Sequence, residues 1–366
     1  MSDLGRIRSM RTRVISAPLV RPWGPDVTRL HLIEVLVDTS SGAVGRGFSW
    51  TPSIGARAVA ALLEHDIQSF ALCEPADPQI LWPRLWSHLH EAGSGGITTI
   101  AMAGLDLALW DAVARASGHS ITQRLGARRA AVPVYGSGVN LHYPIDELVA
   151  QAERWVAAGH ELVKVKVGRP DVAEDVDRIA AVRETIGPNR ALAVDANQRW
   201  DLPTAERAIT ALSRFDLAWI EEPLLADDLA GHATLRSRIG VPVAIGENLH
   251  TVHRFREAID GGACDLVQPN VVRVGGITPF LRIAELADER GVPLYPHLLP
   301  EISGQLALAL PRPTMVEDVE DSAFERLGIL AEPAPVAIAD GMLTSTGRPG
   351  IGIVFSTPTE SEGHPS

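Results

Sequence analysis

Short apolar runs recur through the second half of the chain, and each ends in a charged or polar residue. The last residues of five such runs are 26, 26, 23 and 27 positions apart, which is the length of one strand plus one helix. Apolar residues at helical spacing lie between the runs, for example at 202–212, 226–239 and 277–290, with Gly240 and Gly291 as stop signals. The pattern therefore predicts consecutive strand–helix units. The five runs are Ala191–Asp195, Leu217–Glu221, Val243–Glu247, Asp265–Asn270 and Val292–His297.

The same pattern continues on both sides of these runs. Val132–Ser137 is typical of a first strand, the run that contains Lys164 and Lys166 of a second, and Thr314–Glu317 of an eighth. About eight strand–helix units in a row close into a parallel barrel whose active site lies at the carboxyl ends of the strands. The predicted fold class is α/β, a TIM-type barrel with polar side chains gathered at its mouth.

The first 125 residues follow a different order. Three strand patterns, at 11–19, 30–38 and 43–50, precede three helical patterns at 54–70, 78–90 and 98–117. Strands first and helices afterwards indicate a separate α+β unit, and the last of these helices is assigned to core packing. Proline and glycine within Arg21–Val27 predict a loop between the first two strands, whose Trp23 could contact a ligand, although a plain surface loop is the simpler interpretation of the residues alone.

Lys164 and Lys166 are the only lysines among 33 basic residues, and every other one is arginine. A guanidinium cannot be deprotonated in a protein whereas an ammonium can, so lysine at these two places points to proton chemistry. Val163, Val165 and Val167 alternate with the lysines, which places both ammonium groups on one face of a strand. An amphipathic strand with a solvated face is the alternative interpretation.

Three carboxylates end consecutive strands, Asp195, Glu221 and Glu247. One carboxylate at a strand end is often a helix N-cap, but three that share a low-dielectric barrel mouth would repel one another unless a cation held them. Oxygen ligands without histidine or cysteine suit a hard ion, so Mg²⁺ is the predicted cofactor, with Mn²⁺ second.

These residues carry a family resemblance. The chain resembles the enolase superfamily, and within it the mandelate racemase group, along nearly its whole length. The motifs that match are Lys164-Val-Lys166, Asp195-Ala-Asn197, Trp219–Pro223, Gly246–Asn248, Gly275-Gly276, and His297 followed by Glu301–Ser303.

The resemblance implies a modified (β/α)7β barrel at 126–325, capped by the α+β unit at 1–125. Residues 326–366 would return to the capping unit and end in a disordered tail. It further implies that Asp195, Glu221 and Glu247 bind Mg²⁺, that Lys166 and His297 stand on opposite faces of the substrate, and that Glu317 hydrogen-bonds the substrate carboxylate. Asp318 is a rival to Glu317, but strand alternation points it the other way. Lys164, Asn197, Trp23 and Ser137 are expected to contact the substrate.

The implied reaction begins with abstraction of the α-proton of a carboxylate and passes through an enediolate. Lys166 would be the base, kept neutral by the charge of Lys164 and the metal. Asn270 departs from the group, which usually has aspartate at this position, paired with the histidine of the next strand. Asparagine can accept the Nδ1 proton of His297 but supplies no charge, so His297 is expected to be the weaker base. A racemase needs a base on each face, so this difference favours dehydration of an acid sugar to a 2-keto-3-deoxy acid.

Other functions are less consistent with the residues. A racemase or epimerase of a 2-hydroxy acid and a lactone cycloisomerase are the alternatives within the resemblance. A Schiff-base aldolase has no use for three metal-binding carboxylates, and a metal-dependent hydrolase barrel would show a His-x-His pair at an early strand end. A non-catalytic sugar-acid binding protein would need neither Lys166 nor His297 as a base.

Composition limits the partners and the compartment. A net charge of −12 without a basic run argues against nucleic acid, and the chain shows no signal-peptide pattern and no apolar run expected to span a membrane. Cys73 and Cys264 lie too far apart for a metal-ligand motif. We therefore expect a cytoplasmic enzyme that acts on a small-molecule carboxylate, and the resemblance adds a homo-oligomer.

Overall fold

The computed structural model describes residues 4–24 and 26–356. The chain opens with a three-stranded antiparallel sheet in the order β1-β2-β3, formed by β1 (Ile7–Trp23), β2 (Val27–Thr39) and β3 (Val44–Thr51). The expected meander is present. The loop expected at Arg21–Val27 is shorter, because Arg21–Trp23 belong to β1. β1 runs to Trp23, because pairing with β2 resumes after an irregularity and brings Trp23 opposite Val27. The tail expected to be disordered lies, from residue 357, outside the described residues.

The sheet packs against residues 56–62 and 97–116 of the helices that follow it. These helices are α1 (Ala56–Leu62), a π-helical turn (Leu63–Ile67), α2 (Gln68–Ala71), α3 (Pro78–Leu89), α4 (Ile97–Ala116) and the short α5 (Ile121–Arg124). β3 and α4 approach each other closely, because a side chain on Gly47 would lie 2.3 Å from the carbonyl oxygen of Gly104. By length and composition α4 could span a membrane, contrary to expectation, but 89% of its apolar window is buried inside the protein. The expected role of this helix in core packing is confirmed.

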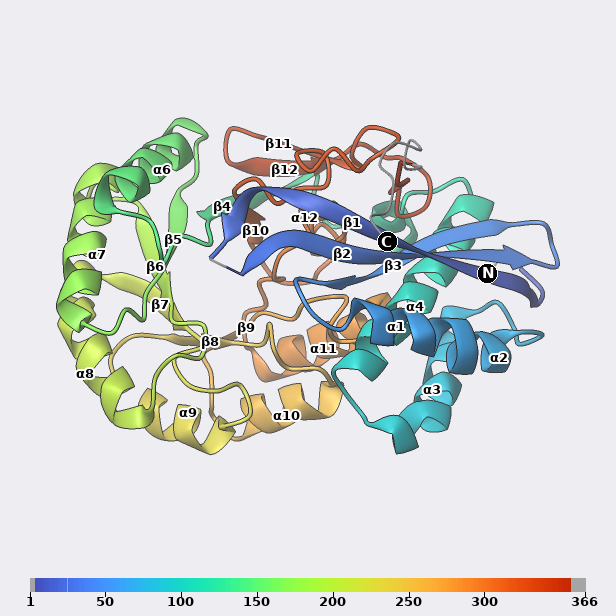
Figure 1. Ribbon diagram of the computed structural model, residues 1–366, viewed down its shortest axis with the longest axis horizontal. Coiled ribbons are helices and arrows are strands. Elements are labelled where there is room, and N and C mark those ends of the chain that lie inside the picture. Colours follow the sequence, from blue (N-terminus) through green and yellow to red (C-terminus); the bar gives the residue numbers. More distant parts are fainter. Residues whose placement is uncertain (1–3, 25, 357–366) are drawn as a thin grey trace, which may run out of the picture.

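Parallel strands form the barrel that fills the other half of the molecule (Figure 1). β10 pairs with β4 and so brings the last strand back to the first. The expected strand Val292–His297 is reduced to a single bridge between Leu294 and Val267, beside a neighbour, β9, of only two residues. The strands are β4 (Ala131–Ser137), β5 (Leu162–Lys166), β6 (Ala191–Asp195), β7 (Leu217–Glu221), β8 (Val243–Ile245), β9 (Leu266–Val267) and β10 (Val316–Val319).

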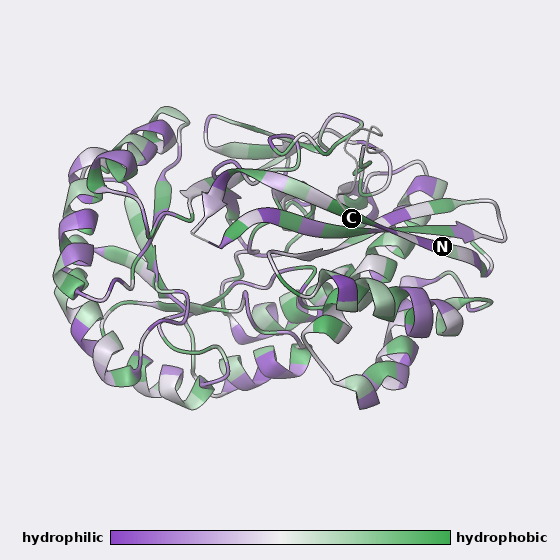
Figure 2. Cartoon of the chain, viewed as in Figure 1, coloured by the Kyte–Doolittle hydropathy of each residue, from purple (hydrophilic) through white to green (hydrophobic). Residues whose placement is uncertain are grey.

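Helices follow these strands in turn, and those between residues 145 and 260 form an outer arc in Figure 1. Figure 2 shows hydrophilic and hydrophobic residues alternating along them, as expected for helices with one face on the barrel. The helices are α6 (Ile145–Ala157), α7 (Val172–Ile186), α8 (Leu202–Leu212), α9 (Leu229–Arg236), α10 (Val252–Asp260), α11 (Ile277–Arg290) and α12 (Pro300–Ala307). The architecture is the expected α/β barrel with an N-terminal capping unit.

The C-terminal segment contacts both units. The hairpin of β11 (Val336–Ala339) and β12 (Met342–Ser345) extends the barrel sheet, because β12 pairs with β4. Farther on, the Phe355 ring lies 5.6 Å from Phe48 of β3, and the backbone N–H of Ile351 donates to Asp111 of α4. The segment therefore contacts the capping unit as well as the barrel.

The start of α11 packs closely against α4 of the capping unit at a glycine, Gly276. Gly276 has φ +109°, and a side chain there would lie 2.3 Å from Oδ2 of Asp106 in α4, a carboxylate that accepts two hydrogen bonds from Thr278. We expect Gly276→Ala to destabilise the protein by about 1–3 kcal/mol, the usual cost of a strained backbone position. Thermal unfolding measures this. The control is Gly240→Ala, which has open space around it and no positive φ; equal melting temperatures for the two variants would contradict the prediction.

Candidate active site

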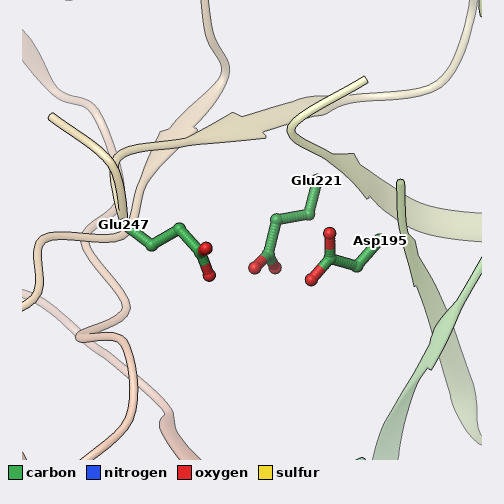
Figure 3. Close-up of side chains that lie close together, drawn as sticks. All are labelled: Asp195, Glu221 and Glu247. Atoms are coloured by element: carbon green, nitrogen blue, oxygen red, sulfur yellow. The ribbon is translucent and has the colours of Figure 1, made fainter. Parts of the chain in front are cut away.

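Three carboxylates meet at the mouth of the barrel (Figure 3). Asp195 ends β6, Glu221 ends β7, and Glu247 follows β8 by two residues. Asp195 pairs with Glu221 in register, so the two side chains leave their strands at the same level. One ligand atom from each of the three carboxylates lies within 4.8 Å of the others, and all three residues are buried. The donor set and its spacing fit a hard divalent cation.

The electrostatics of Glu221 and of its neighbour Glu222 support the same conclusion, whereas His297 and Arg273 lower the pKa of Glu247 despite its burial. Burial and the charge of Asp195 raise the pKa of Glu221 to about 7. The neighbouring Glu222 is also buried, and its pKa is raised well above the usual range by burial and by Glu247. Groups of like charge that are removed from water in this way need positive charge among them. A divalent ion supplies it.

Both lysines point into the barrel beside these carboxylates. Lys164 Nζ lies 2.7 and 2.8 Å from the two oxygens of Glu221 and 2.8 Å from Oε1 of Glu317. Lys166 Nζ lies 2.5 Å from Oδ2 of Asp195. The alternating valines pack outward in the core, as the strand pattern predicted.

Without a metal ion, the pKa of Lys166 is raised above its usual value. Burial alone would lower its pKa, but the charge of Asp195 outweighs burial and the pKa is raised. The pKa of Lys164 is raised in the same way, because Glu221 and Glu317 outweigh its burial. The expectation of a neutral Lys166 rests on the positive charge of Lys164 and of a metal ion. A cation on Asp195 would weaken the ion pair with Lys166.

His297 also contacts the carboxylates at the barrel mouth. Its Nε2 lies 2.7 Å from Oε2 of Glu247 and 3.7 Å from Oε2 of Glu317. Glu317 also accepts a hydrogen bond from the backbone N–H of Leu298 at 3.0 Å, so both of its oxygens have partners. Its predicted contact with a substrate carboxylate stays a prediction. Asp318 points away from the site, with Oδ2 3.8 Å from Nε2 of His160, as alternation along the strand predicted.

The amide of Asn270 is oriented opposite to expectation. Its Oδ1 accepts hydrogen bonds from the backbone N–H groups of Val272 and Arg273, at 3.0 and 3.1 Å. Its Nδ2 therefore faces Nδ1 of His297, at 3.1 Å. Turning the amide would set its NH₂ group against two N–H donors. The expectation that the oxygen accepts from Nδ1 is wrong, because the backbone of the following turn already uses that oxygen.

The residues predicted to contact the substrate have different surroundings. Asn197 donates its backbone N–H to Oδ1 of Asp195 at 2.8 Å, so it supports a predicted metal ligand. Ser137 is buried at the end of β4, in register with Lys164. Trp23 is half-buried and packs against the hydrophobic core. Contact of these residues with substrate stays a prediction.

Several supporting residues had no assigned role in the sequence analysis. Asn248 donates to Oε2 of Glu222 at 2.7 Å and to Oε1 of Glu247 at 3.0 Å, and Arg273 donates to the carbonyl oxygen of Glu247 at 3.1 Å. Asn248 adjoins a predicted ligand in the sequence, which is the one signal that could have identified it. Arg273 comes from a different strand-end loop and carries no such signal.

The backbone of Lys166 is held on both sides. Oδ1 of Asn140 accepts its N–H at 2.9 Å, and Nη1 of Arg178 donates to its carbonyl oxygen at 2.8 Å. Both partners are buried and come from other elements, the loop after β4 and helix α7. The lysine is therefore anchored by contacts that no sequence spacing indicates.

Comparison with known proteins agrees with this geometry. Residues 12–126 match the mandelate racemase/muconate lactonizing enzyme N-terminal domain, and residues 147–359 match the enolase C-terminal domain-like family. The chain belongs to the mandelate racemase/muconate lactonizing enzyme group of the enolase superfamily. The group's predicted ligands in this chain are the three carboxylates that meet at the barrel mouth.

Relatives within the group have several activities. The chain is 38% identical to 3,6-anhydro-alpha-L-galactonate cycloisomerase of Streptomyces coelicolor, over 89% of each protein. It is 34% identical to L-talarate/galactarate dehydratase of Salmonella typhimurium, over 95% of this chain and 86% of that protein. The crystal structure of L-talarate dehydratase from Polaromonas sp. JS666, complexed with Mg and L-glucarate, superposes with a TM-score of 0.87 at 36% identity, over 96% of this chain and 95% of that one. Magnesium is therefore the cofactor found in similar structures.

Proposed function

We propose that this protein dehydrates an acid sugar, a polyhydroxy 2-hydroxy acid, to a 2-keto-3-deoxy acid. Two of its relatives, L-talarate/galactarate dehydratase and arabinonate dehydratase, are acid-sugar dehydratases. In the proposed reaction the base takes the proton of the α-carbon and the β-carbon loses its hydroxyl group as hydroxide, and return of that proton from the base converts the hydroxide into one water. The enol that results becomes the 2-keto group. The orientation of Asn270 is the observation that favours this reaction over racemisation.

Lys166 is the proposed base. It stands at the end of β5 with its backbone held by Asn140 and Arg178, so its amine is fixed relative to the carboxylates. A divalent ion held by Asp195, Glu221 and Glu247 supplies positive charge to the substrate carboxylate as it gains a second negative charge. Lys164 adds a fixed positive charge beside Glu221.

His297 is proposed as a hydrogen-bond donor to the departing hydroxyl. Because Asn270 presents N–H to Nδ1, that nitrogen is the acceptor and the ring proton lies on Nε2, the nitrogen that faces Glu247. A nitrogen that already carries its proton can stabilise a departing oxygen but cannot remove a proton from carbon. A racemase must remove a proton from either face of its substrate, and here one face has the base.

A cycloisomerase is the second candidate, favoured by the identity of 38% to a 3,6-anhydro-alpha-L-galactonate cycloisomerase. Both candidate reactions start with the same proton abstraction, and they differ in whether the leaving oxygen stays attached to the product. The mass of the product therefore distinguishes them. We also propose that the protein is a cytoplasmic homo-oligomer, which light scattering of the purified protein and fractionation of cells would test.

Product analysis tests the proposed reaction. Acid sugars, their lactones and their anhydro forms are incubated with the protein and Mg²⁺, and the products are analysed by mass spectrometry and NMR. We expect a 2-keto-3-deoxy acid one water lighter than an acyclic substrate. A 2-keto product of unchanged mass from a cyclic substrate would indicate the cycloisomerase. Interconverted stereoisomers without a keto acid would overturn the proposal.

Asn270→Asp supplies the matched variant for that experiment. A carboxylate accepts the Nδ1 proton of His297, which frees Nε2 to act as a base. We expect the variant to gain α-proton exchange on the second face of the substrate, seen as deuterium in the epimer when the reaction runs in D₂O. Exchange on both faces by the unchanged protein would contradict the role given to Asn270.

A further inference from the structure

Glu221 accepts a hydrogen bond from Gln268, a residue inside the barrel that has no role in the proposed reaction. Gln268 directly follows β9 and is fully buried, and its Nε2 donates to Oε2 of Glu221 at 2.8 Å. The backbone N–H of Gln268 donates to the carbonyl oxygen of Ile245 at 2.9 Å, so the strand pairing fixes where the side chain starts. Trp219 Nε1 approaches the same carboxylate oxygen at 3.4 Å.

The Gln268 side chain makes this contact at a cost. Its Nε2 has Glu221 and, at 3.5 Å, the hydroxyl of Tyr135 as partners, whereas its Oε1 has no hydrogen-bond partner among residues 4–24 and 26–356. A buried carbonyl group without a partner is unfavourable, and an apolar side chain of the same shape would avoid that penalty. The amide N–H that donates to Glu221 is therefore the reason for a glutamine at this position.

The two oxygens of Glu221 differ as a result. Oε2 is surrounded by donors from Gln268, Trp219 and Lys164, whereas Oε1 is contacted by Lys164. The extra donors on Oε2 restrict rotation of the carboxylate and leave Oε1, which Lys164 contacts, as the oxygen with fewer donors. This arrangement fits a ligand that binds a cation through one oxygen.

We propose that Gln268 is a positioning residue that orients Glu221 as a one-oxygen metal ligand and thereby sets the affinity of the site for Mg²⁺. The role rests on the proposed metal-dependent function. The rings next to these contacts pack together. The Trp219 ring has its centroid 5.6 Å from that of Tyr135 and 5.8 Å from that of Tyr295. Partners that orient metal ligands change metal affinity when they are replaced.

The test measures Mg²⁺ binding to the metal-stripped full-length protein by isothermal titration calorimetry. We expect Gln268→Met to raise the Kd for Mg²⁺ by about 10- to 100-fold. Once a substrate is known, the Mg²⁺ concentration that gives half-maximal activity should rise by the same factor. Activity at saturating Mg²⁺ should stay close to that of the unchanged protein, because the reacting groups remain.

Gln305 offers a matched control. It is also fully buried, its Nε2 donates to two carbonyl oxygens, those of Glu301 and Ile351, and its Oε1 likewise has no partner among the described residues. Gln305→Met removes a buried amide and its two donor contacts, as Gln268→Met does, but should leave the Mg²⁺ affinity unchanged. Equal affinity in the Gln268 and Gln305 variants would overturn the proposal, whether both match the unchanged protein or both are weakened alike.

Two further variants keep the test decisive if Gln268→Met does not fold. Gln268→Glu keeps the shape but, when ionised, has no proton to donate, so it should weaken Mg²⁺ binding at least as much. Trp219→Phe removes the longer contact and should have a smaller effect in the same direction. Absence of Mg²⁺ binding by the unchanged protein would overturn the metal site itself together with this role, whereas binding of normal strength by the Gln268 and Trp219 variants would overturn this role alone.

Discussion

Replacing Lys166 with alanine is expected to lower kcat by about 10²- to 10⁴-fold, because the variant loses the group that removes the α-proton. Lys166 lies in the barrel mouth with Nζ 2.5 Å from Asp195, beside the predicted metal ligands. The measurement is kcat on any substrate that turns over, together with exchange of the α-proton into D₂O followed by NMR. The two readings separate loss of the base from loss of a later step.

Lys166→Arg is the informative companion variant. Arginine keeps the positive charge beside Asp195 but cannot be deprotonated, so it should be as inactive as the alanine variant. Mg²⁺ binding by both variants, measured by calorimetry, verifies that the carboxylate site is intact. If the alanine variant exchanged the α-proton at the normal rate, another residue would be the base. If the arginine variant retained activity, lysine would serve as a fixed charge.

The parts of the fold that local signals determine were predicted residue by residue. β6 and β7 cover the same residues as the apolar runs, and α8 and α11 have the predicted bounds. Asp201 caps the start of α8 through the N–H of Thr204, and Gly291 ends α11 in a left-handed conformation. Such signals lie within a few residues of the element they define, so the sequence carries them directly.

Features that depend on distant partners were predicted less well. The run Val292–His297 has a strand pattern, yet a strand needs a partner in register, and the neighbouring β9 offers two residues. The amide orientation of Asn270 depends on the backbone of the turn at Val272 and Arg273. No residue pattern states where those N–H groups point.

The candidate site also contains residues that the sequence predicted and residues that it did not. Carboxylates and lysines at strand ends were found because strand ends of a parallel barrel converge. The residues that hold them in place, Gln268 under Glu221 and Arg178 behind Lys166, reach the site from elements distant in the sequence. Their contacts follow from tertiary packing, which periodicity does not describe.

Removal of divalent metal is expected to lower activity by at least about 10²- to 10³-fold, the cost of losing a single preorganised donor to a developing oxyanion. The protein is treated with a chelator, dialysed and assayed, and Mg²⁺ or Mn²⁺ is then returned. We expect both ions to restore turnover, because oxygen ligands suit hard cations. Full activity in metal-free protein would refute the site.

The same carboxylates should make stability depend on the metal. Mg²⁺ binds the folded site and not the unfolded chain, so it should raise the melting temperature as its concentration increases. Glu221→Gln should abolish this rise, since an amide is a poorer ligand for a hard cation. Glu301→Gln is the control, because Glu301 is a buried carboxyl whose pKa burial also raises to about 7, but it lies outside the cluster of three carboxylates. A Mg²⁺-dependent rise that survives in Glu221→Gln, or is lost in Glu301→Gln, would show that the ion binds elsewhere. A rise lost only in Glu221→Gln would tie the effect of the metal to the carboxylates at the barrel mouth.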